Sequence, residues 1–150
     1  MTTRDEEFMA EALAEARRSL SQDEFPVGAV VVLDDAVVAA RGHWTGGAVG
    51  RLLDHAEMLA LMEVERTGKV LRRHERQAAT LYTTLEPCAL CMAAAMFFLL
   101  GRAVYAAEAS VDGGTNLLSY GFHPTGIRRM GSRTQSRKWL AASAAKRASP

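Results

Sequence analysis

The sequence predicts an α/β fold in a single domain that spans residues 1–150. The chain has the length of one ordinary domain, is 49% hydrophobic and 23% charged, and contains no low-complexity tract, which together indicate one globular core. Apolar runs typical of strands alternate with segments of helical periodicity. Because strands that are joined by helices favour parallel pairing, the helices are expected to pack on the faces of a sheet.

The first expected elements are an amphipathic helix over residues 4–20 and a β-hairpin. In the helix, an acidic first turn precedes apolar residues that are spaced four apart. These residues are Phe8, Ala12, Ala16 and Leu20. Short apolar runs at 27–33 and 36–42 are joined by Asp34 and Asp35, which predicts two strands and a tight turn.

The next expected elements are a loop over 43–53, which contains three glycines, and a second helix. Asp54 is a good N-cap, so the helix is expected to run from there to Thr67. Gly68 follows as its stop signal.

The last expected elements are a strand at 78–84, a helix that begins at Pro87 and ends at Gly101, and a strand at 102–107. The predicted order is therefore α, β, β, α, β, α, β. The residues after 108 carry no clear prediction, and neither a linker nor an internal repeat is found.

Charge divides the chain into an acidic body and a basic tail. Residues 1–112 hold 11 Lys and Arg against 17 Asp and Glu, whereas residues 113–150 hold seven Lys and Arg and no acid. The tail, from about residue 122, is either a solvated end that balances the body or a contact for nucleic acid.

Targeting signals are not evident in the sequence. No apolar run approaches the roughly 18 residues of a membrane span, and the opening residues "MTTRDEEF" carry acids where a signal peptide would carry a basic start. We therefore expect a cytoplasmic protein. In a reducing compartment, the close pair Cys88 and Cys91 indicates metal or redox chemistry rather than a structural disulfide.

The stretch "TLEPCALC" at 84–91 indicates a metal site. Cys88 and Cys91 are three apart at the expected start of a helix, where the positive end of the helix dipole favours the thiolates that bind zinc. His55, at the start of the preceding helix, is a candidate third ligand. Three protein ligands leave one position for water, as in catalytic zinc sites; a thioredoxin-like redox pair is the alternative interpretation.

Glu57 is a candidate proton carrier for water at such a site. Two residues along an ideal helix correspond to a rotation of about 200°, which would direct Glu57 away from His55. A metal that sits over the helix end can still be reached by both side chains. Taken alone, His55 would be read as a cap or surface group and Glu57 as an acid that stabilises a first turn.

The combination His-x-Glu with Pro-Cys-x-x-Cys is the signature of zinc-dependent nucleobase deaminases, and the chain resembles the cytidine deaminase superfamily. The nearest branch contains tRNA adenosine deaminase, guanine deaminase and cytosine deaminase. The resemblance covers residues 4 to about 110 and implies a three-layer α/β/α fold with a mixed five-stranded sheet, and a homodimer. The matching stretches are "PVGAVVV" (26–32), "HAEMLAL" (55–61) and "TLYTTLEPCALC" (80–91).

The resemblance also implies roles for individual residues. His55, Cys88 and Cys91 would bind Zn²⁺, and Glu57 would move protons. The remaining assignments concern the substrate: the backbone amide of Ala56 could orient it, carbonyls near Leu85 and Glu86 could meet its amine, and Phe25 and Val27 could wall the pocket or simply belong to the core.

Two departures from the family affect the substrate. Many relatives carry an asparagine shortly after the second strand, where this chain reads "RGHWTGG", so that His43 or Trp44 stands in that place. Their side chains offer a different hydrogen-bonding pattern and a stacking face, or Trp44 merely covers the loop. The tRNA-editing relatives carry a lysine-containing loop after the fourth strand, whereas residues 109–121 contain no Lys or Arg.

Three functions remain open at this point. The first is a zinc hydrolase that deaminates a free base, a nucleoside or a related small aminated heterocycle and releases ammonia. The second is a deaminase that converts adenosine to inosine in tRNA and uses the basic tail to hold phosphates. The third is a non-catalytic binding module that zinc stabilises.

Overall fold

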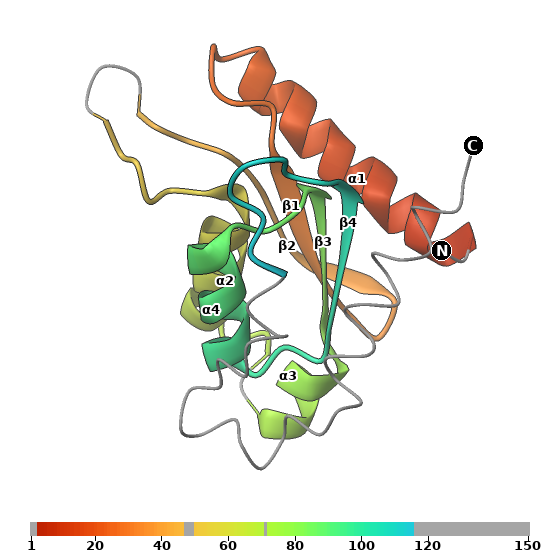
Figure 1. The fold of residues 1–150 in the computed structure, drawn as a ribbon. Helices are drawn as coiled ribbons and strands as arrows, with labels where there is room; N and C mark the ends of the chain where they lie inside the picture. The colour runs from red at the N-terminus through yellow and green to blue at the C-terminus, as the bar shows by residue number, and fades with distance from the viewer. Residues whose placement is uncertain (1–2, 47–49, 71, 116–150) are drawn as a thin grey trace.

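The computed structural model describes residues 3–46, 50–70 and 72–115, and in these ranges the chain folds into a four-stranded mixed sheet between helices (Figure 1). The strand order is β2-β1-β3-β4. The strands are β1 (Gly28–Leu33), β2 (Ala36–Gly42), β3 (Thr80–Leu85) and β4 (Arg102–Ala107). The helices are α1 (Thr3–Leu20), α2 (Ala56–Thr67), α3 (Arg73–Ala78) and α4 (Ala89–Phe98).

The sheet is mixed because β1 pairs antiparallel with both β2 and β3, whereas β3 pairs parallel with β4. The parallel pair is the one that a helix, α4, connects, as expected for a strand–helix–strand unit. A fifth strand, which the resemblance implies, is not among the described residues and stays a prediction, and the basic tail from about 122 also lies outside them.

Alternation along the strands directs one set of side chains to each face, which produces three layers. On one face, Phe8, Met9 and Ala12 of α1 pack with Val30, Val32, Tyr82 and Val104. On the other face, α2 and α4 cover Val31, Leu81 and Ala103. This three-layer α/β/α arrangement confirms the predicted class.

The β-hairpin follows the prediction closely. Asp34 and Asp35 have φ angles of 50° and 59°, so both turn residues are in the left-handed region, as a two-residue hairpin turn with right-handed strand twist requires. Asp tolerates this region better than most residues. At the other end of the hairpin, Gly28 lets β1 approach the backbone of α1 at Ala12 and Ala16, where a Cβ atom would collide.

Three helix boundaries differ from the prediction. The N-cap of α2 is His55 rather than Asp54, although Gly68 ends the helix as predicted, with a φ of 66°. Helix α4 begins after Cys88 rather than at Pro87, and ends at Phe98 with Leu99 in the left-handed conformation, before Gly101. Consequently Cys88 caps the helix instead of lying in its first turn.

The short helix α3 is missing from the prediction. All of its residues are exposed or only half-buried, so it has no apolar stripe from which a helix could be recognised. Its first turn is held by the Glu75 carboxylate, which accepts a hydrogen bond from the Arg72 backbone N–H at 2.8 Å. As a result, β3 begins at Thr80, two residues later than expected.

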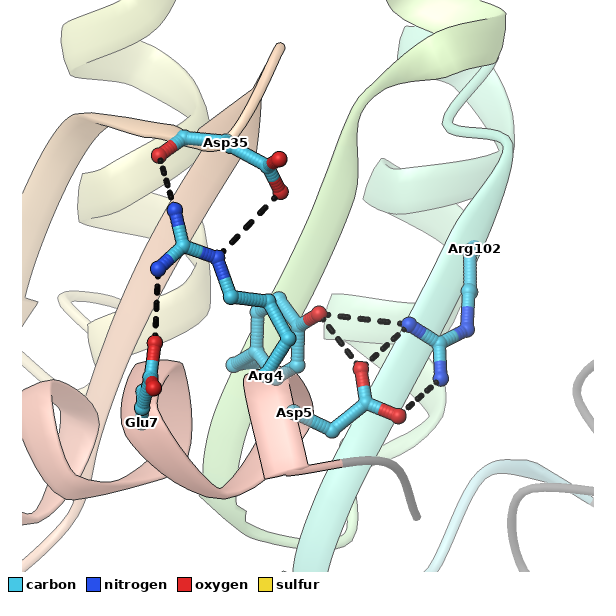
Figure 2. Close-up of polar contacts among 6 residues, drawn as sticks. Arg4, Asp5, Glu7, Asp35 and Arg102 are labelled. Atoms are coloured by element: carbon cyan, nitrogen blue, oxygen red, sulfur yellow. Dashed lines mark hydrogen bonds and ion pairs between the residues drawn. The ribbon is translucent and has the colours of Figure 1, made fainter.

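A polar cluster ties α1 to strands β3 and β4 (Figure 2). Asp5, which is 4% exposed, accepts hydrogen bonds from both terminal nitrogens of Arg102 at 2.7 and 2.8 Å. The Tyr82 hydroxyl donates to the same carboxylate at 2.7 Å and accepts a hydrogen bond from Arg102 at 3.2 Å. Burial, reinforced by the hydrogen bond to Asp5, raises the pKa of Tyr82 to about 12.

Across the described ranges, no helix combines the length and apolar character needed to span a membrane.

The raised pKa of Tyr82 predicts a specific loss of stability at alkaline pH. The folded state favours the protonated phenol, so its contribution is complete below the ordinary pKa of 10 and is lost as the pH rises from there to about 12. We expect the free energy of unfolding of the wild type to fall relative to that of Tyr82→Phe, with a slope of up to about 1.4 kcal/mol per pH unit. Urea unfolding at several pH values measures this difference, and parallel curves for the two proteins would contradict it.

Candidate metal centre

The predicted metal ligands lie at the beginnings of two helices. His55 is the N-cap of α2 and Cys88 is the N-cap of α4, and both have extended backbone conformations. Cys91 lies in the first turn of α4, on the side that faces the core. Helix α4 follows directly after β3, so the end of that strand delivers both cysteines to the position where α2 starts.

The three ligand atoms form a compact triangle. Nδ1 of His55 lies 3.5 Å from Sγ of Cys88 and 3.5 Å from Sγ of Cys91, and the two sulfurs are 3.6 Å apart. A tetrahedral zinc ion, with bonds of about 2.3 Å to sulfur and about 2.0–2.1 Å to nitrogen, would hold its ligands about 3.6–3.8 Å apart. The triangle therefore fits three corners of a zinc tetrahedron, and nitrogen with two sulfurs is a donor set that zinc favours.

The electrostatics of the site also favour a cation. Cys91 is completely buried, and this burial raises the pKa of its thiol, with further increases from Glu57 and Cys88 beside it. Burial likewise raises the pKa of Glu57. Three groups that can become anionic are thus crowded together, and a divalent cation would offset their mutual repulsion.

The carboxyl group of Glu57 lies beside the candidate metal ligands, whereas a helical wheel would direct it away from His55. The wheel does not apply because His55 precedes the helix, whereas Glu57 lies in its first turn. Glu57 is 3% exposed, and its Oε2 lies 3.6 Å from Sγ of Cys91. A carboxyl group in this place can exchange a proton with a molecule at the fourth corner of the tetrahedron.

Thr83 is a site residue that sequence reasoning missed. It is completely buried on β3, and its hydroxyl donates a hydrogen bond to Oε1 of Glu57 at 3.2 Å. The available signal was a threonine two positions after Leu81, which places its hydroxyl on the sheet face that α2 and α4 cover. A hydroxyl in that layer needs a polar partner.

Glu86 holds the loop that follows β4. Its buried carboxylate accepts hydrogen bonds from the backbone N–H groups of Ala109 at 3.2 Å and Thr115 at 3.4 Å, and from the Thr115 hydroxyl. The same loop pairs with the start of α4 through a bridge between Cys88 and Gly113. The side chain of Glu86 therefore has a structural task, and the substrate contact assigned to its backbone region stays a prediction.

A row of rings leads away from the metal ligands. The His43 ring centroid lies 5.3 Å from that of His55 and 5.4 Å from that of Phe25. Burial lowers the pKa of His43, and its Nδ1 is buried with no hydrogen-bond partner in the described part of the chain. Phe25 and Trp44 are 67% and 43% exposed, so neither belongs to the core. These positions are compatible with substrate contacts, which stay predictions.

Val27 and Ala56 occupy less open positions. Val27 is half-buried against the core, and its carbonyl accepts a hydrogen bond from the His43 N–H at 2.8 Å. Ala56 is fully buried as the first residue of α2, between His55 and Glu57. Their assignments to the substrate pocket also stay predictions.

Comparisons with known proteins point to the same chemistry. The profile of the cytidine and deoxycytidylate deaminase zinc-binding region matches residues 2–107. A tRNA-specific adenosine deaminase of Bacillus subtilis is 36% identical over 105 residues, which cover 70% of this chain and 63% of that protein. This chain thus matches less than two thirds of the length of that relative.

Two solved structures share the fold. One, from a study of A-to-I editing by tRNA:A34 deaminases at the wobble position of transfer RNA, is 36% identical with a TM-score of 0.65, and the match covers 79% of this chain and 89% of that chain. The other, a guanine deaminase from Bacillus subtilis, is 26% identical with a TM-score of 0.60, over 88% of this chain and 78% of that chain.

Proposed function

Because the chain belongs to the cytidine and deoxycytidylate deaminase family, whose zinc-binding region matches residues 2–107, we propose that it is a zinc-dependent enzyme that hydrolytically deaminates a nucleobase. The observation that carries this proposal is the convergence of His55, Cys88 and Cys91, with the Glu57 carboxyl beside Cys91. Three ligands with an adjacent acid are the arrangement of a catalytic zinc site, since structural sites use four protein ligands. The same acid argues against a non-catalytic module.

The chain's own residues account for the proton transfers of such a reaction. Zinc would supply a Lewis acid that lowers the pKa of a water molecule toward neutrality. The Glu57 carboxylate would accept a proton from this water and deliver it to the ring nitrogen next to the amino-bearing carbon. After the water oxygen has bonded to that carbon, Glu57 would transfer the remaining hydroxyl proton to the amine, and the carbon–nitrogen bond would break to release ammonia as the carbonyl forms. The hydroxyl of Thr83 would hold Oε1 of Glu57 during both transfers.

The substrate that we propose is an adenosine within tRNA, which becomes inosine. The support is that a curated relative at 36% identity is a tRNA-specific adenosine deaminase, and that a solved structure at the same identity comes from work on tRNA deaminases. Of the three functions that the sequence left open, these relatives favour the conversion of adenosine to inosine in tRNA. Such a substrate would place the protein in the cytoplasm, where fractionation of cells would find it.

A small aminated heterocycle is the second candidate substrate. The structural match to a guanine deaminase extends over 88% of this chain, farther than the match to the tRNA deaminase structure. In addition, the described part of the loop after β4, residues 108–115, contains no Lys or Arg that could contact phosphate.

An apolar face on helices α2 and α4 bears on the oligomeric state of the chain. Helices α2 and α4 leave an apolar hollow of about 220 Å³ between them, lined by Met58, Met62 and Phe97 among others. Met62 and Phe97 are 57% and 67% exposed. We propose that a second copy of the chain covers this face, because exposed apolar patches of this kind commonly mark protein interfaces.

The role of Glu57 predicts a loss of activity without a loss of metal. Glu57→Gln keeps the shape of the side chain but removes the group that exchanges protons, so ammonia release should fall by about 10²- to 10⁴-fold. Ammonia is measured with tRNA, adenosine, guanine, cytosine and cytidine as substrates, and zinc is measured by elemental analysis. Glu57→Gln should retain one zinc per chain, whereas Cys88→Ser should lose it. Undiminished turnover by Glu57→Gln, or wild-type protein that binds no zinc, would contradict the mechanism.

The hydrogen bond from Thr83 to Glu57 predicts that loss of the Thr83 hydroxyl lowers kcat less than Glu57→Gln does and leaves KM unchanged. Thr83→Val keeps the shape but removes the hydroxyl that holds Glu57, so kcat should fall by about two- to tenfold, the value of one net hydrogen bond, while KM is unchanged. Thr83→Ser is the matched control, because it restores the hydroxyl and should recover most of kcat. Equal activities of the Val and Ser variants would show that the hydroxyl does not position Glu57.

The apolar face predicts a dimer that one substitution disrupts. Phe97→Glu should convert a particle of two chains into one of a single chain, because the buried charge would have no partner in the interface. Light scattering after size-exclusion chromatography measures the mass. Leu20→Glu, which changes a residue that is 58% exposed on α1, is the control and should stay dimeric. A wild-type protein with the mass of one chain would disprove the interface.

A further inference from the structure

The positive charge of the acidic body is concentrated in one short segment. Residues 1–112 hold 11 Lys and Arg and 17 Asp and Glu. Five of these cations, but only one of the acids, lie within residues 66–76, between the last turn of α2 and α3. The remainder of residues 1–112 therefore carries six cations against sixteen acids. A polyanion would be repelled by most of this body and attracted to the one segment.

Two of the five cations are engaged in the fold, and three are available. Arg76 pairs with Glu65 at 3.1 Å and lies over the Phe98 ring, and Nζ of Lys69 donates to the Val38 carbonyl at 3.2 Å. The other three, Arg66, Arg72 and Arg73, are exposed, and none forms an ion pair within residues 3–46, 50–70 and 72–115. We call these three residues the α2–α3 arginines.

The position of these arginines excludes direct contact with the reacting base. They follow the far end of α2, whose twelve residues extend for about 18 Å from His55. Figure 1 shows α3 below α2 and α4, whereas the metal ligands lie at the opposite ends of these helices. A free base or nucleoside at the metal centre could not reach the arginines, but a polymer of which that base is one unit could.

We propose that the α2–α3 arginines are a docking surface for the phosphate backbone of RNA, which they hold at a distance from the nucleotide at the metal centre. The proposal rests on the RNA substrate of the proposed function and adds a binding site to it. A guanidinium group can bind one phosphate through two parallel hydrogen bonds, which suits arginine better than lysine for this task. The acidic remainder of the body would discourage other orientations of the RNA.

The surroundings of the arginines favour RNA over other acidic partners. Helix α3 has no buried residue and no apolar stripe, so it lacks the face that a membrane-bound helix inserts among lipids. Every residue of 72–74 is charged or polar and exposed, so this described stretch lacks the aromatic or aliphatic anchors that are typical of protein interfaces. Phosphate contacts need neither feature.

Salt dependence of RNA binding tests the proposal. The probe is a fluorescein-labelled RNA hairpin with an adenosine in its loop, and the protein is the full chain loaded with zinc. Fluorescence anisotropy gives the affinity at several salt concentrations. Each lost phosphate contact reduces the slope of log K against log salt by about 0.7–0.9. The triple variant Arg66→Ala, Arg72→Ala, Arg73→Ala should therefore lose about 2–3 from the slope and bind the hairpin at least tenfold more weakly at low salt.

A matched pair of single variants controls for the general effect of charge. Arg73→Ala and Arg17→Ala each remove one exposed arginine from a helix, Arg17 lying on α1. Only Arg73→Ala should reduce the slope, by about 0.7–0.9. Thermal unfolding by circular dichroism verifies that all variants are folded. An unchanged slope in the triple variant, or equal losses in the two single variants, would overturn the proposal.

Inosine formation in the same hairpin separates this inference from the proposed function. If the wild type forms inosine and the triple variant binds RNA with unchanged affinity, the docking surface is wrong and the deaminase assignment stands. If binding depends on the arginines but no inosine forms, the docking surface stands and the proposed reaction is wrong.

Discussion

The convergence of two thiols and one imidazole, all within 3.6 Å of one another, is the constraint on which the rest of the structure depends. His55 lies 33 and 36 residues from the two cysteines, so local structure cannot bring these groups together. The sheet does so, because β3 ends where α2 begins and leads directly into α4. At both helix starts a candidate zinc ligand occupies the N-cap, which is His55 in α2 and Cys88 in α4.

Buried carboxylates beside the site join its segments into one cooperative unit. Glu57 is held by Thr83 of β3, and Glu86 by the loop after β4. Glu24 accepts hydrogen bonds from the backbone N–H and hydroxyl of Thr45, at 2.9 and 2.5 Å, in the loop that leads to His55. A buried carboxylate without partners is costly. Opening either loop would therefore expose an unsatisfied acid as well as the metal ligands.

Sequence reasoning succeeded where a local pattern determines the structure. The hairpin at Asp34 and Asp35, the end of α2 at Gly68 and the cysteine pair all have short-range signals. It failed for α3, which is held by a cap and has no apolar stripe, and for the exact helix starts at the metal centre. The Asp5–Tyr82–Arg102 cluster joins residues 77 and 97 apart, and the hydrogen bond from Thr83 to Glu57 crosses from strand to helix. Such pairings depend on three-dimensional packing that no single segment specifies.

The three α2–α3 arginines differ in what they contribute to the stability of their helices. Arg66 lies in the last turn of α2, where the negative end of the helix dipole stabilises a cation by about 0.3–1 kcal/mol, so helix stability alone could account for it. Arg72 and Arg73 lie at the start of α3, where the same dipole acts against a positive charge. The guanidinium groups of these two residues form no ion pair in the described part of the chain, although the Arg72 backbone N–H donates to the Glu75 carboxylate. Because their guanidinium groups contribute nothing evident to folding, the choice of arginine at both positions is better explained by the binding of an anionic polymer.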